Sequence, residues 1–366
     1  MNFKTYIQYS IFTLLSILML SCSPKLNKTS SIKSILYPVA PDTARIQYLT
    51  SITTSLDITK KQTALEKTVI GEKKALPIYK PYGVYMRNGK LYVFDIALGG
   101  GLEILDYAKN EFNYFAPKGT FKLNKPINGY VDENNTLYIA DLGLQKIAVI
   151  DAEGNYVNSF GKEENEKPAS VVVQNNKIFV ADLGKNRINV YDKATYKFEY
   201  YFPKSESGDQ DYLYMPTNIT ASKDKIYVSD MGSGDVKIFS LEGNYLKTVG
   251  QYGKNIGDFV RPKGIAVDKE ENIYVVDASF ENVQVFNKEG QLLLFFGGHY
   301  VSKGDMWLPT SVAINYEDIN YFKKYVDPNY ELKYLIIVAN QYGPDKINVY
   351  GRIEPKIKNV NSKKKK

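Results

Sequence analysis

Apolar residues recur along the chain in two alternating kinds of short segment. In the first kind they occupy successive positions and the segment ends in Asp or Asn, as in LYIAD at 137–141 and IYVVD at 273–277. In the second kind, a few residues later, apolar and polar residues alternate, as in INVYD at 188–192 and VQVFN at 283–287. Alternation predicts a strand with one dry face, whereas an unbroken apolar segment predicts a strand covered on both faces. The sheets are therefore expected to pack between neighbouring sheets.

Six copies of this pattern follow one another. The first segments end at Asp95, Asp141, Asp182, Asp230, Asp277 and Asn340. Each copy opens with Pro and a short apolar strand, as in PKGIAV at 262–267, and most copies close with a fourth strand, as in QLLLFFG at 291–297. Four antiparallel strands repeated at steps of 41–48 residues, taken between successive Asp positions, are typical of a β-propeller blade. The sequence predicts an all-β, six-bladed propeller of four-stranded antiparallel blades.

The two ends of the repeat region are expected to meet. The sixth copy ends near residue 351 without a fourth strand, and an unassigned strand, ARIQYLTSI at 44–52, precedes the first copy. We expect this N-terminal strand to complete blade six, because closure removes the exposed edges of an open sheet. Residues 44–351 then form the propeller, 22–43 a tether and 352–366 a basic disordered tail. Residues 315–334 are an insertion in blade six, expected as a loop or helix on one face.

The repeat resembles a known family. PKGIAVDKEENIYVVDASFENVQVFNKEGQLLLFFG at 262–297 is similar to the NHL repeat, and 44–351 as a whole resembles six-bladed NHL-type propellers. VAPDTARIQYLTSI at 39–52 is similar to the opening strand of exported bacterial members. The resemblance implies the fold and does not select an activity, because the family includes binding modules and a few enzymes.

The first 21 residues predict an export signal. A ten-residue apolar core, IFTLLSILML at 11–20, follows Lys4, and the small residue Ser21 precedes Cys22. The core is too short to span a bilayer, and the arrangement resembles a bacterial lipoprotein signal in which Cys22 is lipidated. A plain secretory signal with an incidental Cys is the alternative. We expect an exported lipoprotein, in the outer membrane of a Gram-negative bacterium on its periplasmic or surface face.

Charge and composition exclude several functions. Of the net charge of +7, six units lie in 352–366 and one is Lys4, so the anchored body is neutral. A nucleic-acid partner is not expected, because that needs clustered basic residues on the folded body. The single Cys excludes a disulfide framework, and the single His, His299, excludes zinc sites that need several imidazoles.

The Asp residues that end the first segments have two interpretations. An Asp at a strand end accepts hydrogen bonds from the backbone of the turn that follows, and every blade needs that turn. A ring of carboxylates that binds cations at the channel mouth is the alternative.

The central channel offers a second candidate site. Asn128 and Asn218 stand three residues into their blades, where the other blades have Gly or Ser. Their amide oxygens could join an acidic residue around Ca²⁺, which prefers oxygen ligands. Related lactonase-like six-bladed propellers hold such a channel ion. This alternative predicts a Ca²⁺-dependent hydrolase or lactonase-like enzyme, and without it no cofactor is expected.

The loops between blades offer a third candidate. Three share Gly-Asp, a large apolar residue and the Pro of the next blade, in 208–216, 257–262 and 304–309. Nearby are residue types that are enriched at protein interfaces, although they could equally serve packing: Tyr212, Tyr252, Arg261, His299 and Trp307.

The single His has no identifiable Ser partner, so no catalytic triad is assigned and an enzyme is the less favoured class. We therefore expect a lipid-anchored binding or scaffold propeller. Its partner is expected to be an envelope protein, with a glycan or peptide as second choice.

Overall fold

The structure is a computed structural model that describes residues 34–161 and 164–356. The chain divides into two units, Met1–Ser34 and Ile35–Lys366, and the elements below belong to the second. The predicted signal, Cys22 and most of the tether lie outside the described residues. In the part that is described, no helix is long and apolar enough to cross a membrane.

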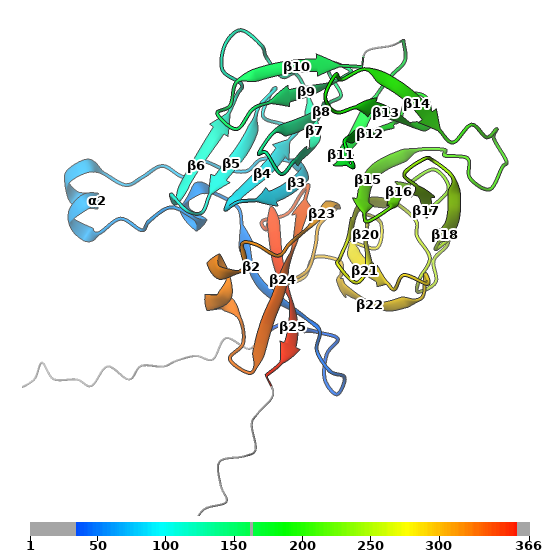
Figure 1. The fold of residues 1–366 in the computed structure, drawn as a ribbon. Helices are drawn as coiled ribbons and strands as arrows, with labels where there is room; N and C mark the ends of the chain where they lie inside the picture. Colours follow the sequence, from blue (N-terminus) through cyan, green and yellow to red (C-terminus); the bar gives the residue numbers. More distant parts are fainter. Residues whose placement is uncertain (1–33, 162–163, 357–366) are drawn as a thin grey trace, which may run out of the picture. The chain divides into compact units, whose positions relative to one another are not determined.

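Six antiparallel sheets form a closed series around one axis, which confirms the predicted six-bladed propeller (Figure 1). Blade one contains β3 (Pro81–Arg87), β4 (Lys90–Asp95), β5 (Leu102–Asp106) and β6 (Glu111–Phe115). Blade two contains β7 (Pro126–Val131), β8 (Leu137–Asp141), β9 (Lys146–Ile150) and β10 (Tyr156–Phe160). Blade three contains β11 (Pro168–Gln174), β12 (Lys177–Asp182), β13 (Arg187–Asp192) and β14 (Phe198–Phe202).

The other three blades repeat this order. Blade four contains β15 (Pro216–Ser222), β16 (Lys225–Asp230), β17 (Asp235–Ser240) and β18 (Tyr245–Val249). Blade five contains β19 (Pro262–Val267), β20 (Ile273–Asp277), β21 (Asn282–Phe286) and β22 (Leu292–Gly297). Blade six contains β23 (Pro309–Asn315), β24 (Tyr330–Asn340), β25 (Ile347–Pro355), β2 (Ile46–Ile52) and β1 (Leu36–Tyr37). The first strands of neighbouring blades contact one another all the way round, so they line the axis.

The second strand of each blade is dry on both faces, as its unbroken apolar sequence predicts. In β12 the side chains of Ile178 and Val180 pack with blade two, whereas Phe179 and Ala181 pack with blade four. All four are at most 3% exposed. Burial of apolar area between blades, at roughly 25 cal/mol per Å², is therefore the main stabilising contribution to the ring.

The N-terminal strand completes blade six, as expected. β2 pairs antiparallel with β25, from Ile46 opposite Arg352 to Ile52 opposite Ile347. Two details differ from the sequence prediction. β1 adds a fifth strand within the region predicted as tether, and β25 runs to Pro355, four residues into the region predicted as tail.

The insertion in blade six is shorter and more buried than expected. β24 begins at Tyr330, and the residues before it form two short 3-10 helices, η3 (Ile319–Tyr321) and η4 (Lys323–Tyr325). Phe322 between them is 2% exposed and belongs to the core between blades six and one. The insertion therefore caps that blade interface and does not stand free on the surface.

The segment between β2 and blade one also contains helical structure. It holds η2 (Ser55–Asp57) and α2 (Ala64–Ile70), each with a capping box at its N-terminus. No residue of α2 is buried, so the helix is held by its local caps and not by packing.

Candidate functional site

The Asp column fixes the loops that connect the blades. Both carboxylate oxygens of Asp230 accept backbone N–H bonds, from Tyr214 and Met215 at 2.6 Å and from Gly232 at 2.9 Å. Asp277 likewise accepts from Val260 at 2.7 Å and Arg261 at 3.1 Å, in the loop before its blade. Each of these Asp side chains thus bonds the loop that enters its blade, and Asp230 also bonds the turn that follows its own strand. Of the two roles that the sequence left open for these residues, this is the structural one.

These bonds define one side of the ring, which we call the loop face. It comprises the blade-connecting loops, among them 203–215, 250–261 and 298–308, and the turns between second and third strands. The opposite side, the hairpin face, carries the turns between first and second strands and between third and fourth strands. All five predicted partner-binding residues, which are Tyr212, Tyr252, Arg261, His299 and Trp307, lie in the three loops of the loop face.

The predicted residues differ in exposure. Tyr252 is 67% exposed and Trp307 is 46% exposed, and Arg261 is also exposed. Tyr212 is partly buried, because its ring packs edge-on against Tyr214 with 4.7 Å between ring centroids. Tyr252 and Trp307 are therefore the predicted aromatic side chains most open to a partner.

Aromatic side chains continue along the loop face through blades four, five, six and one. We call this series the aromatic arc, and its members are Tyr79, Tyr214, Tyr252, Tyr300, Trp307 and Tyr342. Tyr300 and Trp307 stack with centroids 6.2 Å apart, and Lys80 lies 4.7 Å from the ring centre of Tyr342. A Cβ added to Gly343 would lie 3.1 Å from Trp307, so the turn that carries Tyr342 packs against the indole.

Sequence reasoning missed Tyr79, Lys80 and Tyr342. A signal for Tyr342 was present, since it follows the Asp column position Asn340, and the turn there lies on the same side as the Gly-Asp loops. Tyr79 gave no such signal, because it lies in the irregular segment between α2 and blade one.

His299 is held by a neighbouring blade turn. Its Nδ1 contacts the carboxylate of Glu281, and the other oxygen of Glu281 accepts the N–H of Leu308 at 2.9 Å. The imidazole side chain itself is 81% exposed. Glu281 therefore links both ends of loop 298–308 to blade five, and no hydroxyl nucleophile pairs with this His in the described chain.

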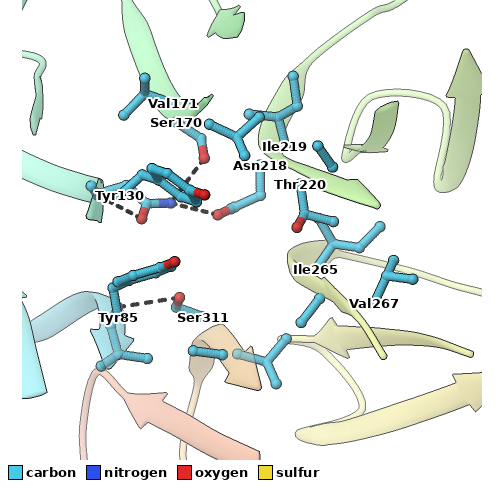
Figure 2. Close-up of a pocket in the computed structure, with 18 of the residues that line it drawn as sticks. Tyr85, Tyr130, Ser170, Val171, Asn218, Ile219, Thr220, Ile265, Val267 and Ser311 are labelled. Atoms are coloured by element: carbon cyan, nitrogen blue, oxygen red, sulfur yellow. Dashed lines mark hydrogen bonds between the residues drawn. The ribbon is translucent and has the colours of Figure 1, made fainter. Parts of the chain in front are cut away.

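The axis contains a cavity of about 210 Å³ lined by the first strands (Figure 2). At its loop-face end Asn128 donates to Asn218 at 2.8 Å and to Ser170 at 3.1 Å. At the other end the rings of Tyr85 and Tyr130 lie with centroids 5.1 Å apart and are partly exposed. The polar end is buried, so the cavity opens toward the hairpin face.

The donor set of this cavity does not favour calcium. The structure does bring Asn128 and Asn218 together, but their amides bond to each other, and the oxygen of Asn128 also accepts the N–H of Gly129 at 2.8 Å. The residues that line the cavity offer amide, hydroxyl and phenol groups and no carboxylate. Ca²⁺ sites normally include carboxylates among six to eight oxygen ligands. Calcium binding by Asn128 and Asn218 stays a prediction, and the cavity lining offers no carboxylate as the acidic ligand that it requires.

Comparisons with known proteins support the fold. Residues 204–366 match the family model DUF5128, described as a 6-bladed beta-propeller. A search of curated proteins found no match. A structural genomics protein of unknown function from Bacteroides thetaiotaomicron has a TM-score of 0.59 at 13% identity, covering 85% of this chain and 76% of that one.

Two lyase structures are also similar. A catalytically inactive variant of virginiamycin B lyase from Staphylococcus aureus, with quinupristin, has a TM-score of 0.53 at 12% identity, covering 75% of this chain and 95% of that one. A streptogramin B lyase has a TM-score of 0.50 at 13% identity, covering 75% and 94%. Identities this low establish a shared fold and no shared activity.

Proposed function

We propose that this protein is a binding or scaffold propeller that holds another cell-envelope protein on its loop face. The observation that carries the proposal is the aromatic arc, in which Tyr252, Trp307 and Tyr342 are 67%, 46% and 44% exposed. Tyr and Trp are the residues that most often dominate binding energy at protein interfaces. Buried carboxylates bond the backbone of the two loops that carry Tyr252 and Trp307, through Asp277 and Glu281 respectively.

The same geometry gives less support to an enzyme. Among the described residues, no three His, Cys, Asp or Glu side chains come together in a way that could hold a metal ion. His299 pairs with a carboxylate on an open surface, where it is not poised toward a nucleophile. The calcium-dependent hydrolase is therefore the weaker proposal.

The location of the protein is also a proposal. We propose an NHL-type propeller of the exported lipoprotein kind, anchored through Cys22 at the outer membrane of a Gram-negative bacterium. The support is the apolar core at 11–20 and the Ser21-Cys22 pair in the sequence. Acyl chains on Cys22 would hold the ring at a bilayer surface, at about 0.8 kcal/mol for each buried methylene. An envelope protein is the partner that such a location favours.

Position-specific photocrosslinking tests which face binds. With a benzophenone amino acid at Tyr252 or Trp307, we expect one specific adduct in intact cells, because both side chains are open on the loop face. Matched probes at Ala152 and Glu289 lie in exposed turns of the hairpin face and are expected to give none. Adducts that form equally from both faces, or only from the hairpin face, would reject the proposed surface.

A further inference from the structure

Lys263 is a buried cation at the loop-face end of the axis. It is the second residue of β19, and its side chain reaches past blade six to the ring of Tyr82 in β3, with 5.0 Å between the Nζ and the ring centre. The corresponding residues of the other first strands are Tyr82, Ile127, Ala169, Thr217 and Thr310. The residue is only 5% exposed, so the long aliphatic chain is covered.

The ammonium group of Lys263 has no anionic partner. Within the described residues it forms no salt bridge or hydrogen bond, and its only close charged neighbour is Arg261. Burial, together with the Arg261 guanidinium, lowers the pKa of Lys263 to about 8. A covered aliphatic stem and an ammonium group without an anionic partner indicate a group that can bind an anion.

The surroundings at this end of the axis are rich in hydrogen-bond donors, and the carboxylates nearby are already occupied. Arg261 is exposed on the loop before β19. Burial raises the pKa of Tyr82, and the positive charge of Arg261 acts to lower it. Carboxylates nearby, such as Asp277, are occupied by backbone N–H groups. Just inside the ring, the amide nitrogen of Asn218 also has no partner in the described part of the chain. Two cations without a free carboxylate favour an anion over a metal ion.

We infer that Lys263 and Arg261, with the ring of Tyr82, form an anion-binding site at the loop-face end of the axis that receives a carboxylate of the bound partner. This inference rests on the proposed function, since the site lies on the same face as the aromatic arc and Arg261 shares loop 250–261 with Tyr252. A partner segment would place an Asp or Glu side chain against Lys263 and Arg261, and its neighbouring residues against Tyr252. The partner is thus an acidic peptide segment.

The site is tested with small probes on the full mature chain, without the partner. An acetylated tri-glutamate amide, at about ten times its Kd, is expected to raise Tm by about 2 °C. The matched tri-glutamine peptide is expected to leave Tm unchanged. Lys263→Met and Arg261→Gln should each abolish the shift, whereas Lys254→Met, an exposed cation in the same loop, should retain it.

Each other outcome overturns the inference. A shift that persists in Lys263→Met, or that is lost equally in Lys254→Met, would show diffuse charge attraction and no built site. A larger shift with inorganic phosphate than with the peptide would replace the carboxylate by a phosphoryl ligand. Arg261→Gln changes an exposed residue, so it remains informative if Lys263→Met does not fold. If no probe binds while Tyr252 and Trp307 still crosslink a partner, the anion site fails and the proposed function stands.

Discussion

Replacing Ile46 by Asp is expected to lower the free energy of unfolding by at least about 4 kcal/mol. The substitution places a charge in the apolar core beside β2, the strand that completes blade six and closes the ring. Ile46 is 1% exposed and packs among the apolar residues shared by blades five and six. It begins β2, the strand that pairs with the last strand of the chain. Urea unfolding followed by circular dichroism measures the change.

The matched control is Leu65→Asp. Leu65 is 73% exposed on α2, so the same change in size and charge there should alter stability by less than about 0.5 kcal/mol. If Ile46→Asp were as mild as this control, β2 would not contribute to closure. Aggregation of the Ile46→Asp protein would agree with the account, since a loosened β2 exposes the edge of β25.

Replacing Glu103 by Gln is expected to stabilise the protein at neutral pH by about 3 kcal/mol. Glu103 lies in β5, is fully buried, and neither of its carboxyl oxygens has a hydrogen-bond partner in the described part of the chain. Burial, and then repulsion from the Asp95 carboxylate, raise its pKa from 4.5 to about 9. In blade five the equivalent Gln284 bonds to the preceding loop, so Gln suits this place in the fold.

The sign of the effect follows from proton binding. Between pH 4.5 and about 9 the folded protein keeps the Glu103 proton and the unfolded chain loses it, so stability falls by about 1.4 kcal/mol for each pH unit. The stability that comes from the retained Glu103 proton is fully present below pH 4.5 and is lost as the pH rises toward 9. Denaturant unfolding at pH 5 and pH 8 should show the gain from Glu103→Gln growing with pH. A gain that is equal at both values would contradict a protonated Glu103.

The fold was predictable because the repeated pattern determines how many sheets form and how the two ends of the chain pair. Six copies of one apolar pattern specify six sheets, and a missing fourth strand at one end with a spare strand at the other specifies closure. The elements that sequence reasoning missed are not repeated. β1, α2 and the 3-10 pair around Phe322 occur once each, so no second copy exists to reveal their pattern.

The candidate site was predictable only in part, for a related reason. Tyr252 and Trp307 lie in loops with a recurring Gly-Asp motif, and the topology places such loops on one face. Tyr342 and Lys80 join them only because blades six and one are neighbours in space. Lys263 contacts Tyr82 past the intervening blade six, and local sequence cannot reveal a contact between strands two blades apart. The isolated Lys in a first strand was the one available signal.

The affinity for the captured partner tests the central claim most directly, namely that the loop face is the working surface. Once photocrosslinking has identified that protein, its Kd is measured for the wild type, Trp307→Ala and Phe198→Ala. Phe198 is a matched control, an aromatic residue 44% exposed on β14 and away from the loops. We predict that Trp307→Ala raises Kd about 30-fold, a loss of about 2 kcal/mol, and that Phe198→Ala changes it less than twofold. An unchanged Kd for Trp307→Ala, or a larger loss for Phe198→Ala, would contradict the account.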